Sequence, residues 1–592
     1  MSVAVRTRRP LCGARTDHLD ALPPVLSRVY RNRVSDPGDL ILAWDALPSF
    51  DLLADLPRAA ARLAEAVRRN ERIVISGDYD SDGSSATAVL VRALRAFGVE
   101  ARFIIPDRMR EGYGLSVPLA RRLVDEFHPQ IVITVDNGIS AHEGIALLEN
   151  QGIPVLCTDH HLPGSSLPGA YAIVNPRRQD DIYPSKALAG VGVAFALAVA
   201  TRARLIAAHW DRTHPAVKES LAPLLDLVAL GTVADVVPLD RVNRLLIDQG
   251  LQRLRASRGS SPGITALAAV AGRPVTTMQA QDLAFSIAPR LNAAGRLADM
   301  TVGVRLLITD DPREAVELAH ELDAINRQRR DIEDRMREQA EIALGGTHLP
   351  DASGRAAITL FDPSWHEGVV GLVAGRIKDK THRPVVAFAP GAEGLLKGSA
   401  RSISGVHIRD VLARLDAEHP GWIVRFGGHA AAAGLSLKPE CVGPFEDALN
   451  EAVLAVAPDW IEAATLWTDG VLAPEEFTIH TARSLRDGGP WGQGFPPPRF
   501  MGEFTILSVR MLSDGLHARM SVVPEGGKTP LTAIAFHCPR HGWSPVPGSA
   551  RFVYGLEVNS FRGDESAQIV VDEILPEAPM PSDQPAPGAE IR

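Results

Sequence analysis

Three carboxylates crowd into one short turn in the first part of the chain. The segment 77–83 reads GDYDSDG and places Asp78, Asp80 and Asp82 at alternate positions, directly after an apolar run. Oxygen ligands gathered on one turn suit a hard divalent cation. The alternatives are a solvated acidic turn or a calcium loop, but the EF-hand pattern fails because no Glu follows at the required spacing. We therefore predict a metal site here.

Two more groups of metal-ligand type follow apolar runs. Asp136 comes directly after the run 130–135, and the triplet Asp159-His160-His161 comes shortly after the run 153–157. Taken singly, an Asp at a strand end is often a helix cap, and adjacent histidines are more often surface residues. If the runs are parallel strands, however, their carboxyl ends meet at the edge of the sheet where ligands bind. The three groups would then share one crevice.

A fourth candidate is Asp235, within the apolar segment 231–238 (GTVADVVP). A buried carboxylate needs a partner, which a metal ion, a capping contact or a salt bridge would supply. Mixed carboxylate and imidazole ligands suit Mn²⁺ and, less strictly, Mg²⁺. Five or six such ligands can hold two ions about 3.5–4 Å apart, which activate water and stabilise charge on phosphorus during in-line attack. The predicted chemistry is metal-dependent hydrolysis of phosphodiesters.

Motifs in the second half offer groups that could face a substrate. Arginine forks match phosphate oxygens, and a Gly-rich turn before a helix lets backbone N–H groups approach a phosphate. We interpret the segment 425–434 as such a turn leading into a helix of small residues. Tight helix packing is the commoner meaning of any single Gly- and Ala-rich motif. The candidate residues are Arg290, Asn292, Arg296, Ser399, Arg401, Gly427, Gly428 and His429.

The elements that must position these side chains alternate along residues 41–260. Short β-branched runs are followed by helical stretches, which predicts an α/β domain with a parallel sheet and helices on both of its faces. We expect a helix over 84–97. Strands are expected over 72–76, 101–105, 130–135 and 153–157.

A long helix dominates the predicted connector, residues 261–346. Asp311 can cap its start and Gly345-Gly346 its end. Its length would be about 50 Å at 1.5 Å per residue. A highly charged helix of that length usually spans domains rather than filling a core.

Two smaller domains are expected after the connector. Residues 347–460 form a second, smaller α/β segment, and residues 461–577 contain short alternating strands typical of a small β-barrel. The Pro- and Gly-rich stretch 488–498 is predicted to be a loop. We expect residues 1–40 to be a loosely packed lead-in and residues 578–592 to be a disordered tail.

Composition narrows the class of protein. Hydrophobic residues make up 45% and charged residues 22%, which is typical of a soluble globular chain. We identify no apolar run of the roughly 18 residues that a membrane helix needs, and no secretory signal. Four widely spaced cysteines argue against a disulfide framework or zinc knuckle and fit a reducing cytoplasm. A net charge of −9 argues against non-specific coating of nucleic acid, although a local basic groove would serve an enzyme.

Taken in order, the motifs resemble the DHH phosphoesterase superfamily and, within it, the RecJ family of single-strand-specific exonucleases. The resemblance covers nearly the whole chain. The motifs that carry it are GDYDSDG at 77–83, VDNGIS at 135–140, DHH at 159–161, GTVADVVPL at 231–239, APRLNAAGR at 288–296, HEGVVGLVAGR at 366–376, GSARS at 398–402, GGHAAAAG at 427–434 and LEVNSFRGDESAQIVVDEI at 556–574.

The resemblance implies a fold and a set of roles. The fold is a parallel-sheet DHH domain, a long connecting helix, a smaller α/β DHH-associated domain and a C-terminal OB-fold barrel. The activity is stepwise 5′→3′ removal of nucleotides from single-stranded DNA with two Mn²⁺ or Mg²⁺ ions, in DNA repair and recombination. Asp136 is the candidate bridge between the ions. The other implied metal ligands are Asp78, Asp80, His160 and Asp235, with Asp82 and His161 beside them.

The remaining implied roles concern the substrate and partners. His429 would face the metals from the second domain. Arg290, Arg296, Ser399 and Arg401 would contact the DNA backbone or its 5′ phosphate, with Arg108 and Tyr113 at the same entry. Expected partners are single-stranded DNA, a single-strand-binding protein and a RecQ-type helicase, with no membrane, and the chain is expected to be a monomer.

One position departs from the family pattern. Many relatives carry a His two residues before Asp78, where this chain has Ser76. We expect the second metal to be held more loosely for that reason, or through water. Two alternatives remain: a DHH-superfamily phosphoesterase of short oligonucleotides or nucleotide phosphates, and a non-catalytic replication scaffold. The 461–577 segment argues against the first, and the complete acid and histidine set against the second.

Overall fold

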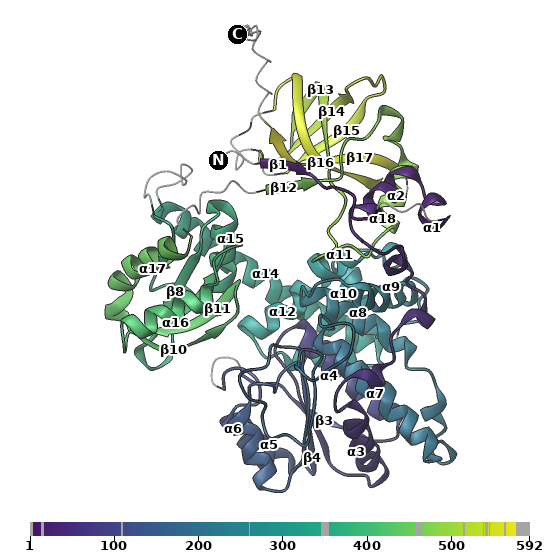
Figure 1. The fold of residues 1–592 in the computed structure, drawn as a ribbon, viewed down its shortest axis with the longest axis vertical. Helices are drawn as coiled ribbons and strands as arrows, with labels where there is room; N and C mark the ends of the chain where they lie inside the picture. Colours follow the sequence, from purple (N-terminus) through teal and green to yellow (C-terminus); the bar gives the residue numbers. More distant parts are fainter. Residues whose placement is uncertain are drawn as a thin grey trace, which may run out of the picture. The chain divides into compact units, whose positions relative to one another are not determined.

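The structure is a computed structural model, shown in Figure 1. By their contacts, residues 41–462 and 490–496 form one compact unit, and residues 1–40, 463–489 and 497–592 form another. The structure describes residues 4–12, 17–107, 111–259, 261–344, 355–457, 465–512, 515–536, 538, 543, 545–561 and 564–575.

A five-stranded sheet lies at the centre of the first domain in the larger unit. Its order is β3-β2-β4-β5-β6 and all its pairs are parallel, as predicted. Runs of Ile and Val form its central strands because both faces are buried. The short β6 was not predicted. The strands are β2 (Ile73–Ser76), β3 (Arg102–Ile104), β4 (Ile131–Val135), β5 (Val155–Thr158) and β6 (Ala172–Val174).

Helices cover both faces of this sheet (Figure 1). On one face α5 (Val117–Phe127) and α6 (His142–Asn150) bury apolar side chains against β2 and β4. The other face packs on α3 (Leu56–Arg68), α4 (Ser81–Ala96) and α7 (Gly190–Ala207). The α4 helix begins at Ser81 rather than at residue 84, because the Asp80 side chain accepts a hydrogen bond from the N–H of Gly83 at 2.9 Å and caps it.

The helix α7 corrects one sequence expectation. Among the described residues it is long and apolar enough to cross a membrane, with 18 residues and a mean hydropathy of 1.5. Its residues are mostly buried, and it packs on α3, α4 and α8 (Leu225–Ala234). This apolar run is therefore a core helix of an α/β domain, buried all round over Gly190–Ala198.

The long helix of the connector is confirmed as α14 (Pro312–Ala343), and Asp311 caps it by accepting from the N–H of Arg313. Its first half packs on other connector helices, whereas Met336 and Ala340 join the core of the next domain, so it spans both. The predicted Gly345-Gly346 end lies outside the described residues. Helix α9 (Arg241–Arg255) precedes the connector. The other connector helices are α10 (Pro262–Val270), α11 (Ala280–Asp282), the π-helix η8 (Leu283–Ile287), α12 (Ala288–Leu297) and α13 (Thr301–Ile308).

The second domain is a mixed sheet in the order β10-β11-β9-β8-β7, in which only β7 and β8 are parallel. Helix α15 (Val370–Thr381) packs with α14, and α16 (Ile408–Glu418) packs with α17 (Val442–Val456). The strands are β7 (Ile358–Phe361), β8 (Val385–Pro390), β9 (Leu396–Arg401), β10 (Ile423–Gly428) and β11 (Ala432–Leu437).

The predicted small-residue helix after the Gly-rich turn is wrong. Residues 432–437 are strand β11, which pairs with β10 on one side and β9 on the other. The end of β10 lies close to β11: a Cβ on Gly428 would lie 2.4 Å from the carbonyl oxygen of Ala432. The segment is a β-hairpin, so no helix N-terminus is available there for a phosphate.

The smaller unit contains the predicted barrel, closed in the order β13-β14-β15-β17-β16. Its strands are β13 (Phe500–Met511), β14 (Ala518–Pro524), β15 (Leu531–Ala535), β16 (Gly548–Phe561) and β17 (Asp564–Leu575). The same unit includes α18 (Ile479–Asp487). The predicted tail, 578–592, lies outside the described residues.

The N-terminal segment is not the loosely packed lead-in that we expected. Strand β1 (Ala4–Thr7) pairs in parallel with β12 (Thr465–Thr468), and α1 (Asp17–Asp20) and α2 (Pro24–Arg31) follow. Leu19 and Val29 are fully buried. The segment belongs by its contacts to the barrel unit, an association between chain ends that no local pattern reveals.

Candidate active site

The predicted metal-ligand groups converge where neighbouring strands end. Strands β2, β4 and β5 lie side by side, and Asp78, Asp136 and His160 follow them in turn. Three overlapping sets of donor atoms lie within 4.8 Å of one another: Asp78, Asp80 and Asp136; Asp136, His160 and His161; and Asp82, His160 and Asp235.

His160 lies at the centre of these donors. Its Nε2 atom lies 3.1 Å from Asp136 Oδ1, 3.4 Å from Asp235 Oδ2 and 4.0 Å from Asp82 Oδ2. Burial lowers the pKa of His160 to about 3, so its ring is neutral at physiological pH. Neutral imidazole is the form that binds a metal.

Burial and neighbouring negative charges raise the pKa values of the carboxyl groups around His160. Burial raises the pKa of Asp136 well above its usual value, and the charges of Asp82 and Asp80 add to the rise. Burial likewise raises the pKa of Asp235, again with help from Asp82. These carboxyl groups therefore hold their protons more tightly than usual, and a bound cation would favour their ionised forms.

These residues fit a divalent cation. Asp136 Oδ1 and both ring nitrogens of His160 are buried and have no hydrogen-bond partner within the described part of the chain. Buried polar atoms in proteins almost always have a hydrogen-bond partner. Unsatisfied oxygen and nitrogen atoms within a cluster of acidic residues therefore indicate a cation site. Mn²⁺ and Mg²⁺ both accept such carboxylate-rich ligand sets.

The N-terminus of α7 holds Asp82 in place. The Asp82 carboxylate accepts hydrogen bonds from the N–H groups of Gly190 at 2.8 Å and Val191 at 3.0 Å. A helix N-terminus favours such a negative charge, yet burial and the neighbouring Asp80 still raise the pKa of Asp82 to about 7. Asp82 thus connects the group of predicted metal ligands, called the metal cluster below, to the core helix α7.

Asp159 positions the histidine pair and is not itself available as a ligand. Its Oδ1 accepts from the N–H of His160 at 2.7 Å and lies 2.8 Å from His161 Nδ1, while Oδ2 accepts from the N–H of Ile139. Although burial opposes ionisation, the bond to His161 lowers the pKa of Asp159 to about 2. The same bond outweighs burial at His161 and raises its pKa to about 9.

Two rings lie against His161. The hydroxyl of Tyr113 is 3.4 Å from the His161 ring nitrogens and donates to the carbonyl of Asp136 at 3.3 Å. The ring of His429, from the β10–β11 hairpin, is stacked on His161 with centroids 6.3 Å apart. The structure thus brings both predicted residues to the metal cluster. Arg108 lies outside the described residues.

Other predicted substrate residues lie near the start of α15. A Cβ on Gly371 would come within 2.8 Å of both Ser399 Oγ and Arg401 Nη2. Arg401 also donates to Ser399 Oγ at 2.9 Å. Arg296 donates to the carbonyl of Gly368 at 3.2 Å, just before that helix. These two half-buried arginines remain candidates for binding phosphate.

Arg290 and Asn292 have structural partners instead. Arg290 is buried and its guanidinium pairs with Asp323 of α14 at 2.9 Å, so it joins two helices. Its contact with DNA stays a prediction. Asn292 Oδ1 accepts from both the N–H and the hydroxyl of Ser81, at 2.8 and 2.9 Å. That contact fixes the GDYDSDG turn from α12. Asn292 and Arg296 are four residues apart on one face of α12, whereas Arg290 lies on another face.

Of the two glycines before His429, only Gly428 is required by the backbone, and the substrate contact of both stays a prediction. Gly428 adopts φ +144 and lies against β11, whereas Gly427 has open space around it. Ser76 ends β2, fully buried, and its hydroxyl has no hydrogen-bond partner among the residues described. Its effect on the second metal stays a prediction.

Sequence reasoning missed several positioning residues. Asn137 donates to the carbonyls of Ser76 and Val135 and so ties β2 to β4. Asn175 donates to the carbonyl of His161 at 2.9 Å. Gly190 was missed too, although a glycine before an apolar helix was a usable signal. The partners of Asn137 and Gly190 include Ser76 and Asp82, which lie 61 and 108 residues away, so spacing within a motif could not assign them.

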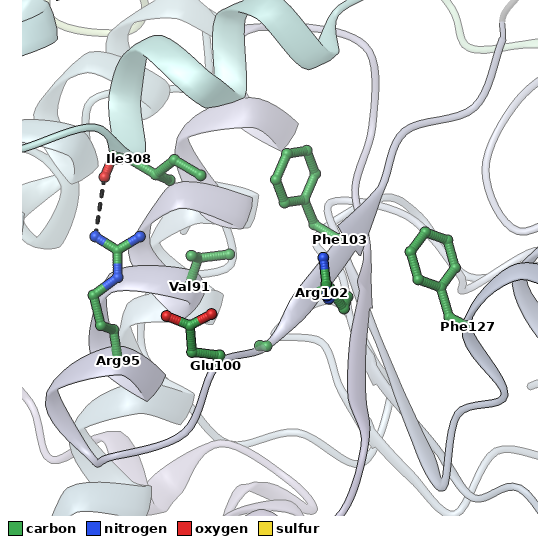
Figure 2. Close-up of a pocket in the computed structure, with 8 residues that line it drawn as sticks. Val91, Arg95, Glu100, Arg102, Phe103, Phe127 and Ile308 are labelled. Atoms are coloured by element: carbon green, nitrogen blue, oxygen red, sulfur yellow. Dashed lines mark hydrogen bonds between the residues drawn. The ribbon is translucent and has the colours of Figure 1, made fainter. Parts of the chain in front are cut away.

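A cavity of about 250 Å³ lies elsewhere in the same domain (Figure 2). Its lining includes Arg102 and Phe103 of edge strand β3, Phe127, and Arg95, which donates to the carbonyl of Ile308 at 3.2 Å. Arg102 begins β3, so this cavity opens at the amino end of the strand. The metal donors gather at the carboxyl ends, where ligands of parallel sheets bind.

Family models match three parts of the chain. The DHH family N-terminal domain matches residues 72–232, the DHHA1 domain matches 354–455, and the RecJ OB domain matches 468–573. A curated relative from Dickeya dadantii (strain 3937), named single-stranded-DNA-specific exonuclease RecJ, is 45% identical over 585 residues. The match covers 96% of this chain and 98% of that relative. The chain belongs to the RecJ family.

Other RecJ proteins agree in sequence and fold. The one from Escherichia coli (strain K12) is 44% identical, over 97% of this chain and 100% of its own length. The crystal structure of RecJ with Mn²⁺ from Thermus thermophilus superposes with a TM-score of 0.79 at 31% identity, covering 98% of this chain and 80% of that one. The predicted architecture, with DHH, DHHA1 and OB-type domains, is confirmed. A structure of the same Thermus protein holds Mg²⁺.

Proposed function

We propose that this RecJ family member is a metal-dependent exonuclease that degrades single-stranded DNA 5′→3′ to 5′-mononucleotides by two-metal phosphodiester hydrolysis, in DNA repair and recombination. The observation that carries the proposal is the convergence of Asp78, Asp80, Asp136, His160 and Asp235 at adjacent strand ends. The names of the relatives, single-stranded-DNA-specific exonucleases, support the choice of substrate.

In this proposal the ligands act through their placement. Asp136 lies in two of the three donor sets, which suits it to bridge two ions. Bound metals would supply an activated water and charge stabilisation at phosphorus. Asp82 anchors the cluster to α7, and Asp159 holds the His160–His161 backbone through two N–H bonds.

Cationic and hydrogen-bonding side chains around the cluster would orient the DNA. The bond to Asp159 favours the imidazolium form of His161, which can donate to a phosphate oxygen. His429 stacks on that ring and would share the same phosphate. Arg296, Ser399 and Arg401 would bind the backbone or the 5′ phosphate. Tyr113, about half exposed, offers a ring on which a base can stack.

An end-labelling experiment tests the activity. Single strands and duplexes labelled at the 5′ or the 3′ end are incubated with Mn²⁺, Mg²⁺ or a chelator. We expect early release of labelled mononucleotide only from the 5′-labelled single strand, and none with chelator. Early release from the 3′ end, or attack only on dinucleotides or nucleotide phosphates, would overturn the proposal.

A pair of substitutions tests the metal assignment. Asp136→Ala should remove detectable exonuclease activity and weaken Mn²⁺ binding, because it deletes the shared ligand. Asp487→Ala, at a half-exposed Asp of α18, should leave both unchanged. Undiminished cleavage by Asp136→Ala would contradict the assignment.

The finer organisation is also a proposal. We place domain boundaries near residues 41, 261, 347 and 461, and a monomeric protein in the cytoplasm, where the DNA is. A single-strand-binding protein and a RecQ-type helicase are the proposed partners. Light scattering of the purified chain tests the monomer, and co-purification with each candidate from the same organism tests the partners. A stable dimer would overturn the monomer. A candidate partner that does not co-purify with this chain would be overturned as a partner.

A further inference from the structure

The predicted loop in the Pro- and Gly-rich stretch 488–498 contains a buried aromatic pair. Residues 490–496 read PWGQGFP and belong by their contacts to the unit that contains the metal cluster. Trp491 and Phe495 are 6% and 4% exposed, and their rings stack with centroids 5.1 Å apart. Ordinary surface loops rarely contain two large aromatic side chains that are both buried.

The loop is closed on itself. The N–H of Gly492 donates to the carbonyl of Phe495 at 2.9 Å, and the N–H of Phe495 donates back at 3.1 Å. Gly494 adopts φ +74, which the tight turn requires and which glycine tolerates. The result is a rigid turn that presents its rings and one backbone carbonyl to the rest of the unit.

That turn contacts the segment just after the metal-ligand motif GTVADVVP. The carbonyl of Gln493 accepts from the N–H of Leu239 at 2.7 Å. The guanidinium carbon of Arg244, in α9, lies 4.1 Å from the centre of the Phe495 ring. Arg244 is only 4% exposed, so this cation–π contact is desolvated and correspondingly strong. The loop therefore holds residues 239–244 by one backbone bond and one buried cation.

The turn between α8 and Leu239 is strained. Asp235 follows α8, and Val236 adopts φ +61 with its side chain 64% exposed. A β-branched residue rarely adopts the left-handed region, and it persists there only when its surroundings hold it. On the other side, Asn243 donates to the carbonyls of Ala187 and Pro238, at 2.7 and 3.0 Å.

We propose that the loop 490–496 is a positioning element of the metal site, with Phe495 as its main side chain. By holding Leu239 and Arg244 it keeps the strained turn in the form that presents Asp235 Oδ2 3.4 Å from His160 Nε2. The proposal rests on the metal-ligand role given to Asp235 above. Without the loop, Val236 relaxes and Asp235 leaves the cluster.

The test measures Mn²⁺ binding to the full-length protein without DNA, by titration followed by electron paramagnetic resonance. Phe495→Ala should weaken binding roughly 10-fold, as losses of residues that orient metal ligands do. The Mn²⁺ concentration for half-maximal exonuclease activity should rise by the same factor, while kcat at saturating Mn²⁺ is kept. Phe361→Ala, the same substitution at a partly exposed position of β7, should change neither.

Three further variants separate positioning from folding. Phe495→Tyr keeps the ring over Arg244 and should restore Mn²⁺ affinity. Val236→Gly removes the cost of φ +61 and should recover part of the affinity in the Phe495→Ala background. If Phe495→Ala does not fold, Phe495→Leu keeps apolar bulk without the ring face and should show the weakened binding.

The outcomes distinguish this proposal from the one beneath it. Unchanged Mn²⁺ binding in Asp235→Asn would mean that Asp235 is not a metal ligand. That result would overturn both the ligand role of Asp235 and the positioning role of the loop. Weakened binding in Asp235→Asn, together with wild-type binding in the folded Phe495 variants, would overturn the positioning role alone. If a Phe495 variant has a lower melting temperature but wild-type Mn²⁺ affinity, the loop only stabilises the fold, and the positioning role is overturned.

Discussion

At the scale of single residues, the proposed metal ligand Asp136 has an unusual backbone conformation. Asp136 adopts φ +60, a region that Asp tolerates better than most residues, and its N–H donates to the carbonyl of Thr158 at 3.0 Å. Its side chain lies directly against the first residue of α7. A Cβ on Gly190 would come within 2.6 Å of Asp136 Oδ1 and 2.8 Å of Asp136 Cβ. The glycine is therefore part of the site's shape.

We predict that Gly190→Ala will displace Asp136 and lower Mn²⁺ affinity and exonuclease activity by roughly 10–100-fold. The substitution should act on the metal site more than on the fold, because Ala is a good helix residue. Calorimetric titration with Mn²⁺ measures the loss.

Gly192→Ala, in the same helix, is the matched control. There the added Cβ would meet the Leu188 side chain, 2.5 Å from Cδ1, and no metal ligand. It should cost about 1–3 kcal/mol of stability through overpacking and leave Mn²⁺ affinity unchanged. Equal loss of affinity in both variants would contradict the explanation.

At the scale of elements, the barrel carries a carboxylate with a shifted pKa. Asp572 of β17 pairs with Arg499 at 2.6 Å, yet burial outweighs that attraction and raises the pKa of Asp572 to about 6. The neighbouring Glu557 and Glu573 add to the rise. The folded barrel thus binds this proton more tightly than the unfolded chain does.

We predict that the barrel loses stability as pH rises from about 4 to 6. A folded pKa above the unfolded value stabilises the fold fully below the unfolded pKa, and that contribution is lost as pH passes the folded pKa. The change is at most about 3 kcal/mol for a shift of about two units. Hydrogen exchange of β16 and β17 amides, corrected for intrinsic rates, should show faster opening at about pH 7 than at about pH 5.

Asp572→Asn should abolish that pH difference, because the asparagine does not titrate. A pH difference of the same size in the variant would assign it to other groups.

At the scale of the whole molecule, two chain ends form one unit through a buried charge. Asp469, just after β12, accepts from Arg33 Nη2 at 2.8 Å, Asn32 Nδ2 at 3.1 Å and the N–H of Arg499 at 3.1 Å. The side chains of Arg33 and Asp469 are 2% and 0% exposed. This ion pair ties the N-terminal segment to the barrel.

We predict that Asp469→Ala destabilises the barrel unit by about 3–5 kcal/mol, since it removes the carboxylate that pairs with the buried Arg33 charge. Hydrogen exchange should rise in peptides from 4–40 and 465–575, while peptides from 41–457 and Mn²⁺ affinity stay as in wild type. The exposed pair Arg486–Asp487 offers the control: Asp487→Ala should cost at most about 1 kcal/mol. Uniform loss of protection across the chain would contradict the two-unit description.

The sequence by itself determined the catalytic sheet and most of the site. Runs of Ile and Val identified the strands. Because the carboxyl ends of parallel strands meet at one edge of a sheet, the positions of Asp78, Asp136 and His160 after three such runs predicted that they lie together. The cap at Asp311 marked the long helix correctly. These inferences rest on local periodicity and on sheet geometry, both of which are written along the chain.

Tertiary structure alone decided which polar groups remain available for chemistry. Arg290 and Arg296 lie six residues apart in one motif, yet Arg290 pairs with Asp323 of a distant helix and is buried. Ala432–Leu437 is a strand because β9 and β10 lie on either side of it. Asp235 depends on a turn that Phe495 supports from 260 residues away. Partners distant in sequence are chosen by packing of the whole chain, which spacing within a motif does not encode.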